Sequence, residues 1–172
     1  MRWLKPQRVI EVGIYIGAGS LHLAQGLADN GHGELHLVDW NQARLIDVES
    51  KIRRANLAVP IHTHCGDSIV LGREGKIPKA DFIFVDAGHE YAGATQQLAV
   101  YSSLLSEGGL MAFHDSILWE GVCRATSDLF GDGRLLFTLA SSGGAGVSLI
   151  SKAAAPASPA AKRDARLVRE FL

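Results

Sequence analysis

The stretch Arg8-Val9-Ile10-Glu11-Val12-Gly13-Ile14-Tyr15-Ile16-Gly17-Ala18-Gly19-Ser20 decides the fold. Its apolar run is typical of a buried strand, and the glycine-spaced turn that follows opens onto a helical pattern at Leu21. A strand, a tight loop and a helix N-terminus together present backbone N–H groups to a nucleotide-like ligand. We therefore expect a ligand-binding loop here, and the alternative is a tight strand-to-helix turn that holds no ligand.

The bulk composition narrows the class of protein. The chain has 172 residues, of which 47% are hydrophobic and 20% charged, and this fits one domain with a sizeable core. A net charge of −1 gives no electrostatic case for nucleic-acid or membrane partners, and we expect neither. Cys65 and Cys123 lie outside any CxxC spacing, which indicates reduced thiols. With no signal-peptide pattern and no long apolar run, we expect a soluble, cytoplasmic protein.

Strand-like and helical segments alternate to about residue 130, which predicts a Rossmann-like, doubly wound α/β fold. We expect a mostly parallel, seven-stranded sheet that closes with an antiparallel C-terminal hairpin. The expected strands are 8–12, 34–39, 61–65, 81–86 and 110–113, with the hairpin at 135–139 and 146–150. The expected helices are 20–29, 41–56, 91–105 and 121–130, with an irregular or short helical connection at 72–79.

The predicted domain spans residues 1–152. Residues 153–161 contain only Ala, Pro and Ser, which is a linker composition. The remaining residues, 162–172, are expected either to form a short amphipathic helix or to fray.

Polar residues stand at the ends of five predicted strands, where open parallel sheets bind their ligands. They are Glu11 with Gly13, Asp39, Gly66 with Asp67, Asp86 with His89, and His114 with Asp115. The first loop has the spacing Gly-x-x-x-Gly-x-Gly, which is neither the dinucleotide nor the triphosphate pattern. It therefore indicates a nucleoside-like ligand without phosphate, and Asp39 is placed to accept hydrogen bonds from ribose hydroxyls.

Other positions have two interpretations. Asp67 with Ser68 either pairs with an adenine amino group or caps a helix that starts after it. Trp40 either stacks on adenine or packs, and we interpret Trp3 and Trp119 as packing residues. His62 and His64 alternate onto one face of a strand, which permits metal binding. Because they lack nearby cysteine or acidic partners in the sequence, we interpret them as ordinary strand histidines.

The segment from Glu11 to Ser20 resembles motif I of class I S-adenosylmethionine-dependent methyltransferases, and Asp39 matches the ribose-binding acid of that class. Segments 85–93 and 104–115 are similar to the methyltransferase domain 24 type, which is related to catechol O-methyltransferase-like enzymes. The likeness covers about Val9 to Ser116. It implies S-adenosylmethionine as the cofactor and a sugar or natural-product hydroxyl as the acceptor. The implied cofactor-binding residues are Glu11, Gly13, Tyr15, Gly17, Ser20, Asp39, Trp40, Gly66, Asp67, Ser68 and Asp86.

The resemblance also implies a metal site and a base. In catechol-type relatives, acids that match Asp86 and Asp115 bind Mg²⁺, and a catalytic lysine falls at His89 by spacing. Because Asp115 is not followed by the usual Asn or Asp, we add His114 as a candidate ligand. We expect His89 to be the base, since imidazoles change protonation near neutral pH. Alternatively, His89 is a solvated loop residue, His114 contacts the substrate, and Asp86 contacts the cofactor or caps a turn.

We therefore expect an O-methyltransferase that works with or without Mg²⁺ at Asp86 and Asp115. The alternatives are a metal-independent N-methyltransferase and a non-catalytic nucleoside-binding module with the same fold. Catechol-type relatives carry substrate-covering helices before the first strand, whereas seven residues precede it here. The acceptor site is then open, or it is covered by Leu118–Trp119 and the C-terminal segment, or by a second subunit in a homo-oligomer.

Overall fold

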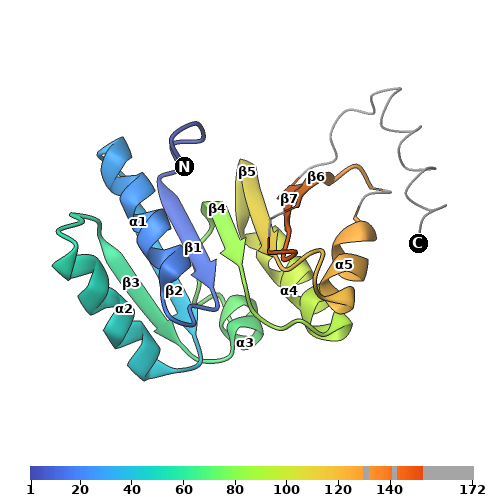
Figure 1. The fold of residues 1–172 in the computed structure, drawn as a ribbon, viewed down its shortest axis with the longest axis horizontal. Helices are drawn as coiled ribbons and strands as arrows, with labels where there is room; N and C mark the ends of the chain where they lie inside the picture. Colours follow the sequence, from blue (N-terminus) through green and yellow to red (C-terminus); the bar gives the residue numbers. More distant parts are fainter. Residues whose placement is uncertain (130–131, 141–142, 153–172) are drawn as a thin grey trace.

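The computed structural model of the chain describes residues 1–129, 132–140 and 143–152. Within these residues, seven strands form one sheet in the order β3-β2-β1-β4-β5-β7-β6 (Figure 1). Strands β1 to β5 pair in parallel, whereas β7 runs antiparallel to both β5 and β6. The predicted α/β fold, the seven-stranded sheet and the antiparallel hairpin are confirmed. The predicted linker and tail, 153–172, lie outside the described residues.

The elements largely follow the predicted pattern. The strands are β1 (Arg8–Val12), β2 (Glu34–Asp39), β3 (Ile61–Cys65), β4 (Ala80–Val85), β5 (Leu105–His114), β6 (Leu135–Leu139) and β7 (Val147–Ser151). The helices are α1 (Ala18–Asn30), α2 (Gln42–Arg54), α3 (Ser68–Arg73), α4 (Tyr91–Leu104) and α5 (Glu120–Ser127).

Two predicted boundaries were wrong. The helix between β3 and β4 lies at α3, ahead of the connection expected at 72–79, because the Asp67 side chain caps its first turn. Strand β5 begins at Leu105 rather than at Leu110. Its first residue pairs with Ala80 across a register shift in the β4–β5 ladder, so residues 105–109, which precede the predicted strand, lie inside the observed one.

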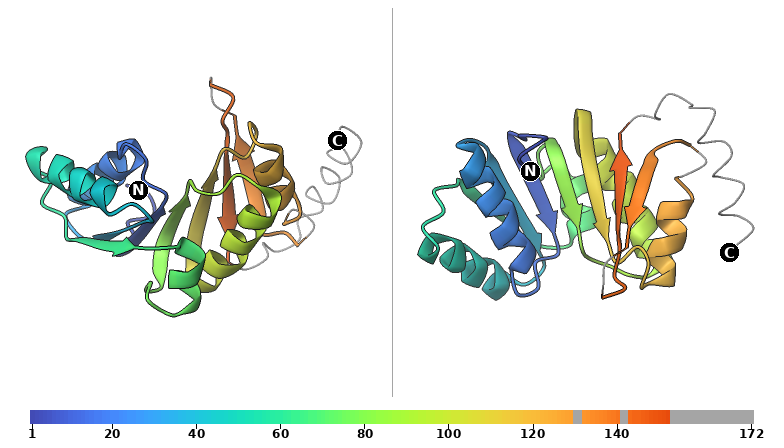
Figure 2. Two further views of the ribbon diagram at one scale, coloured as in Figure 1. Left: turned by 90° about the horizontal axis from the view of Figure 1, so that it is seen from below. Right: turned by 45° about the horizontal axis from the view of Figure 1, so that its top comes forward.

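Helices cover the sheet in two layers, which Figure 2 shows from two further directions. Helices α1 and α2 pack on one face, where Leu27 and Leu45 belong to the same core cluster as Val9. Helices α4 and α5 pack on the other face, in a cluster that includes Tyr101 and Ile83. Central strands are therefore buried on both faces, which explains their nearly continuous apolar sequences.

The structure also shows the state of the cysteines and the exposure of Trp3. Both cysteines are free; Cys65 is exposed and Cys123 is half-buried. Trp3 is 87% exposed, so its assignment as a packing residue was wrong. No helix in the described ranges is long and apolar enough to cross a membrane.

The strand order reverses between β1 and β4, and the loops that follow these strands meet there. Gly13, directly after β1, has φ +83°, a conformation that side chains disfavour. A Cβ atom at Gly13 would collide with the backbone carbonyl oxygen of Asp86, directly after β4. Glycine is therefore needed here both for its dihedral angle and for the close approach of the two backbones.

We expect Gly13→Ala to lower the free energy of unfolding by roughly 3 kcal/mol or more. The positive φ alone costs ~1–2 kcal/mol for an L-residue, and the collision with Asp86 adds to it. Gly31→Ala is the matched control, because Gly31 has φ +73° but no atom within 4 Å of its added Cβ. Urea unfolding followed by circular dichroism measures both losses. Equal losses in the two variants would show that the collision at Gly13 contributes nothing.

Candidate active site

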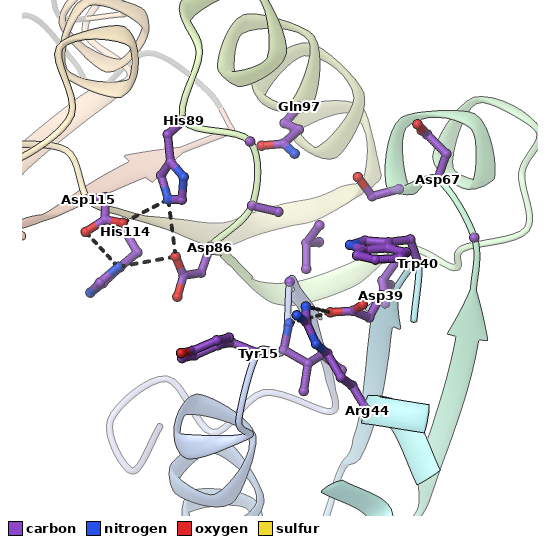
Figure 3. A pocket seen from close by; sticks show the side chains of 18 residues that line it. Tyr15, Asp39, Trp40, Arg44, Asp67, Asp86, His89, Gln97, His114 and Asp115 are labelled. Carbon is purple, nitrogen blue, oxygen red and sulfur yellow. Dashed lines mark hydrogen bonds and ion pairs between the residues drawn. The ribbon is translucent and has the colours of Figure 1, made fainter. Parts of the chain in front are cut away.

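A cavity of about 610 Å³ opens beyond the carboxyl ends of strands β1 to β5 (Figure 3). One of its ends lies beside Trp40 and Asp67, and the other lies beside His89 and Asp115. The predicted site residues that line it are Gly13, Tyr15, Asp39, Trp40, Gly66, Asp67, Ser68, Asp86, His89, His114 and Asp115. The rim that the sequence predicted at the strand ends is thus gathered into one cavity.

Three predicted cofactor residues, Glu11, Gly17 and Ser20, are not among the lining residues and stand behind the first loop. The Glu11 carboxylate is 1% exposed and accepts a hydrogen bond from the Ser20 hydroxyl. Gly17 caps α1 with φ +84°, and its N–H donates to the Ile14 carbonyl at 2.8 Å. These residues therefore hold the conformation of the first loop and do not face the cavity.

Burial raises the pKa of the Glu11 carboxyl to about 8. Repulsion from Asp86 and Asp39 adds to this rise, and the hydrogen bond from Ser20 opposes it. The protonated form is therefore the favoured form of Glu11 at neutral pH. A neutral Glu11 avoids placing a third negative charge beside Asp39 and Asp86.

Asp39 joins the first loop to the loop after β2. Its Oδ2 accepts a hydrogen bond from the Ile14 N–H at 3.0 Å, and its Oδ1 accepts one from the Asn41 N–H at 2.8 Å. The residue is 5% exposed and still borders the cavity. Because a carboxylate offers about four acceptor positions, two remain for the hydroxyls of a ligand.

Arg44 is a lining residue that sequence reasoning missed. Its guanidinium lies 5.7 Å from the ring centroid of Tyr15 and 5.6 Å from that of Trp40, which are cation–π distances. One of its nitrogens is 3.9 Å from Asp39 Oδ2. Nothing in the sequence separates Arg44 from the other basic residues of α2. Its position depends on the helix start, which the Asn41 side chain sets by capping α2.

At the Trp40 end, both interpretations of Asp67 have support. Its Oδ1 accepts hydrogen bonds from the N–H groups of Ile69 and Val70, as a helix cap does. The side chain is also exposed and lines the cavity. Trp40 is 71% exposed and lines the same end, so its ring is accessible to a stacking partner.

At the other end, four side chains converge from the loop after β4 and from the end of β5 with the residue that follows it (Figure 3). His114 Nδ1 lies 3.4 Å from Asp86 Oδ1 and 3.2 Å from Asp115 Oδ1. His89 Nε2 lies 2.9 Å from Asp115 Oδ2 and 3.9 Å from Asp86 Oδ1. Burial raises the pKa of Asp86, an effect that His114 and His89 reduce and Asp115 increases.

The backbone and a neighbouring ring hold this cluster in place. Asp115 has φ +59°, an uncommon conformation for a residue with a side chain. The Trp119 ring stacks on His89, with centroids 4.8 Å apart and planes inclined by 22°. Trp119, which the sequence indicated as a packing residue, packs on a residue of the site and is 46% exposed. Leu118 beside it is 60% exposed.

The cluster has the donor chemistry of a metal site. Asp86, His114 and Asp115 offer ligand atoms that all lie within 4.8 Å of one another. His114 Nδ1 and His89 Nε2 are buried, and despite the short distances neither has a hydrogen bond of acceptable geometry. A cation held by Asp86, His114 and Asp115 would satisfy His114 Nδ1. Carboxylates suit Mg²⁺, and an added imidazole extends the choice to ions such as Mn²⁺ or Zn²⁺.

Gln97 of α4 is, after Arg44, the second polar lining residue that the sequence did not reveal. It is 4% exposed, and its Oε1 has no hydrogen-bond partner among the described residues. An amide within a helix carries no sequence signal of its own. Only the packing of α4 against the sheet turns this side chain toward the cavity.

The comparisons with known proteins agree with this geometry. A family model described as a methyltransferase domain matches residues 10–116. A relative from Dictyostelium discoideum, named probable caffeoyl-CoA O-methyltransferase 3, is 30% identical over 139 residues. The match covers 74% of this chain and 51% of the relative, so the chain spans about half the length of that curated protein.

Solved structures share the fold at low sequence identity. The O-methyltransferase TomG from Streptomyces achromogenes, which is involved in tomaymycin synthesis and was solved with S-adenosylmethionine, superimposes with a TM-score of 0.71. It is 19% identical, over 87% of this chain and 75% of TomG. An O-methyltransferase from Bacillus cereus in complex with SAH gives 0.70 at 16% identity, over 87% and 76%. The chain belongs to the class I S-adenosylmethionine-dependent methyltransferases of the methyltransferase-domain family, as the resemblance predicted.

We expect Glu11→Gln to flatten the dependence of stability on pH. With its pKa raised from 4.5 to about 8, the folded chain binds more protons than the unfolded chain between these pH values. Stability therefore falls as pH rises through this interval, by up to several kcal/mol, since one unit corresponds to ~1.4 kcal/mol. Urea unfolding at pH 5, 6.5 and 8 measures the difference. The control is Glu120→Gln on the surface, and parallel curves for wild type and Glu11→Gln would contradict the assignment.

Proposed function

We propose that the chain is an O-methyltransferase that methylates a hydroxyl group of a small organic molecule with the help of a divalent metal ion. One observation carries the proposal. A single cavity joins a nucleoside-type end, at Asp39 and Trp40, to a cluster of carboxylates and imidazoles at Asp86, His89 and Asp115. The names of the relatives above, which are O-methyltransferases, support the same reaction.

The first half of the cavity suits S-adenosylmethionine. Asp39 has free acceptor positions for the ribose hydroxyls, and the exposed face of Trp40 is available to adenine. The absence of a phosphate-binding pattern in the first loop fits a cofactor without phosphate. The Gly13 backbone and Tyr15 line the path toward Asp86. When bound, the cofactor would supply a methyl group attached to a sulfonium sulfur. The neutral thioether that remains after transfer is a good leaving group.

The second half of the cavity suits an acceptor hydroxyl. We propose His89 as the base that takes the hydroxyl proton onto a ring nitrogen, with Asp115 and Trp119 fixing the orientation of its ring. Asp86, His114 and Asp115 would hold the metal, which makes a bound hydroxyl more acidic. Most of the rate acceleration would come from aligning the oxygen with the methyl group. This cluster favours a metal-assisted reaction over the metal-independent N-methyltransferase.

We expect Trp40→Ala to weaken the binding of S-adenosylmethionine by about tenfold. Stacking of a base on an aromatic side chain contributes ~1–3 kcal/mol, and an exposed side chain is lost with little effect on folding. Trp3→Ala is the matched control, since Trp3 is even more exposed and does not line the cavity. Isothermal titration calorimetry measures both affinities. Equal affinities in the two variants would remove Trp40 from the adenine site.

We expect His89→Ala to reduce methyl transfer at least ~100-fold, because a positioned base contributes ~10²–10⁴-fold. Cofactor affinity should stay close to that of wild type. Transfer of a radiolabelled methyl group to a panel of catechols, sugars and amines measures the rate. His22→Ala on α1, outside the cavity, is the control.

The same assay tests the metal and the acceptor. EDTA should abolish transfer and added Mg²⁺ or Mn²⁺ should restore it. Unchanged transfer in His89→Ala would exclude His89 as the base, and unchanged transfer in EDTA would exclude the metal. Methylation of amines alone would favour the N-methyltransferase instead.

A further inference from the structure

A second group of histidines lies on the pair of strands at the edge of the sheet, away from the cavity. Strand β2 contributes Glu34 and His36, and β3 contributes His62 and His64. In the parallel ladder, His36 stands directly opposite His62. The sequence alone showed His62 and His64 without an acidic partner. The neighbouring strand supplies the partner, because Glu34 and His36 alternate onto the same face.

The nitrogen and oxygen atoms of this group converge. His36 Nε2 lies 3.2 Å from Glu34 Oε1, and His62 Nε2 lies 3.3 Å from Glu34 Oε2. The rings of His36 and His62 are stacked, with centroids 4.6 Å apart and planes inclined by 21°, so both face the same carboxylate. One ligand atom from each of the three residues lies within 4.8 Å of the other two.

These separations match a tetrahedral metal site. Zinc binds imidazole nitrogen and carboxylate oxygen at ~2.0–2.2 Å, so neighbouring ligand atoms of a tetrahedron lie about 3.3–3.6 Å apart. The distance from His36 to Glu34 Oε1 and the distance from His62 to Glu34 Oε2 are both close to this range. The His62 side chain is 48% exposed, so it has room to adjust. Imidazole and carboxylate ligands favour Zn²⁺, Cu²⁺ or Ni²⁺ over Mg²⁺.

His64 is placed to orient the ring of His36 by a hydrogen bond. Its Nε2 is 2.9 Å from His36 Nδ1, the nitrogen that points away from Glu34. When His36 donates from Nδ1 to His64, its Nε2 carries the lone pair that a metal needs.

We propose that Glu34, His36 and His62 form a binding site for a transition metal of the Zn²⁺ type, which ties the edge strand β3 to β2. This site is separate from the candidate active site. Glu34 begins β2 whereas Asp39 ends it, and none of the three residues lines the cavity. The bound metal would stabilise a strand that has a neighbour on only one side.

Arg8 limits the affinity of this site. Its Nε donates to Glu34 Oε1 at 2.5 Å, which places a fixed positive charge beside the metal position. Glu34 Oε2 remains directed at His62. Repulsion between the guanidinium and the metal weakens binding. We therefore expect a dissociation constant in the micromolar range, weaker than that of a closed zinc site.

Equilibrium dialysis with Zn²⁺ alone, followed by metal analysis, tests the proposal. The active-site cluster also offers metal ligands, so wild type should bind two equivalents. Asp86→Asn combined with Asp115→Asn should bind one equivalent, and adding His62→Ala to that variant should abolish binding. The control for the last step is His22→Ala, an exposed histidine of α1. Circular dichroism shows whether each variant is folded.

A second variant and a second measurement keep the test independent of one substitution. Glu34→Gln preserves the shape of the side chain and should weaken Zn²⁺ binding at least tenfold at this site. Zn²⁺ should also slow hydrogen exchange of β3 amides in the Asp86→Asn/Asp115→Asn background. Retention of the equivalent in both His62→Ala and Glu34→Gln, or an equal loss in His22→Ala, would overturn the proposal.

Discussion

The two loop backbones that meet between Gly13 and Asp86 set the dimensions of the whole cavity. Because the contact is made by backbone atoms, it fixes the separation of β1 and β4 ends independently of side-chain rotamers. Asp39 then attaches the nucleoside end to the same loop through the Ile14 N–H. Asp86, which makes the contact, also belongs to the cluster of carboxylates and imidazoles at the other end of the cavity. Both ends of the cavity are thus connected to the close backbone contact that Gly13 permits.

Electrostatics imposes a second constraint on the same region. Glu11, Asp39 and Asp86 lie close enough for the last two to raise the pKa of the first. The hydrogen bonds of Asp39 come from backbone N–H groups. The carboxyl groups of this region therefore have two different roles. Glu11 is buried and protonated as a support, and the acids that border the cavity remain available to a ligand.

The sequence predicted the site wherever chain order determines position. Strands that read as apolar runs ended in polar residues, and parallel pairing carried these ends to one rim, so Asp39, Asp86 and Asp115 were found. Arg44 and Gln97 were missed because the orientation of a helix on the sheet decides where their side chains point. The partners of His62 were missed because they depend on the pairing of β2 with β3. The start of β5 was wrong because a register shift at Ala80 has no marker in the sequence.

The reversal of strand order has a consequence for how the chain holds together. Strands β1 to β3 come from the first 65 residues, and the remaining strands come from the rest of the chain. The β1–β4 ladder is the seam between these two portions of the sheet. A ligand that reaches from Asp39 to Asp86 would contact both portions of the sheet. Its binding free energy then also stabilises the contact between the two portions, so the resistance of the chain to heat and proteolysis would rise with the logarithm of the free cofactor concentration.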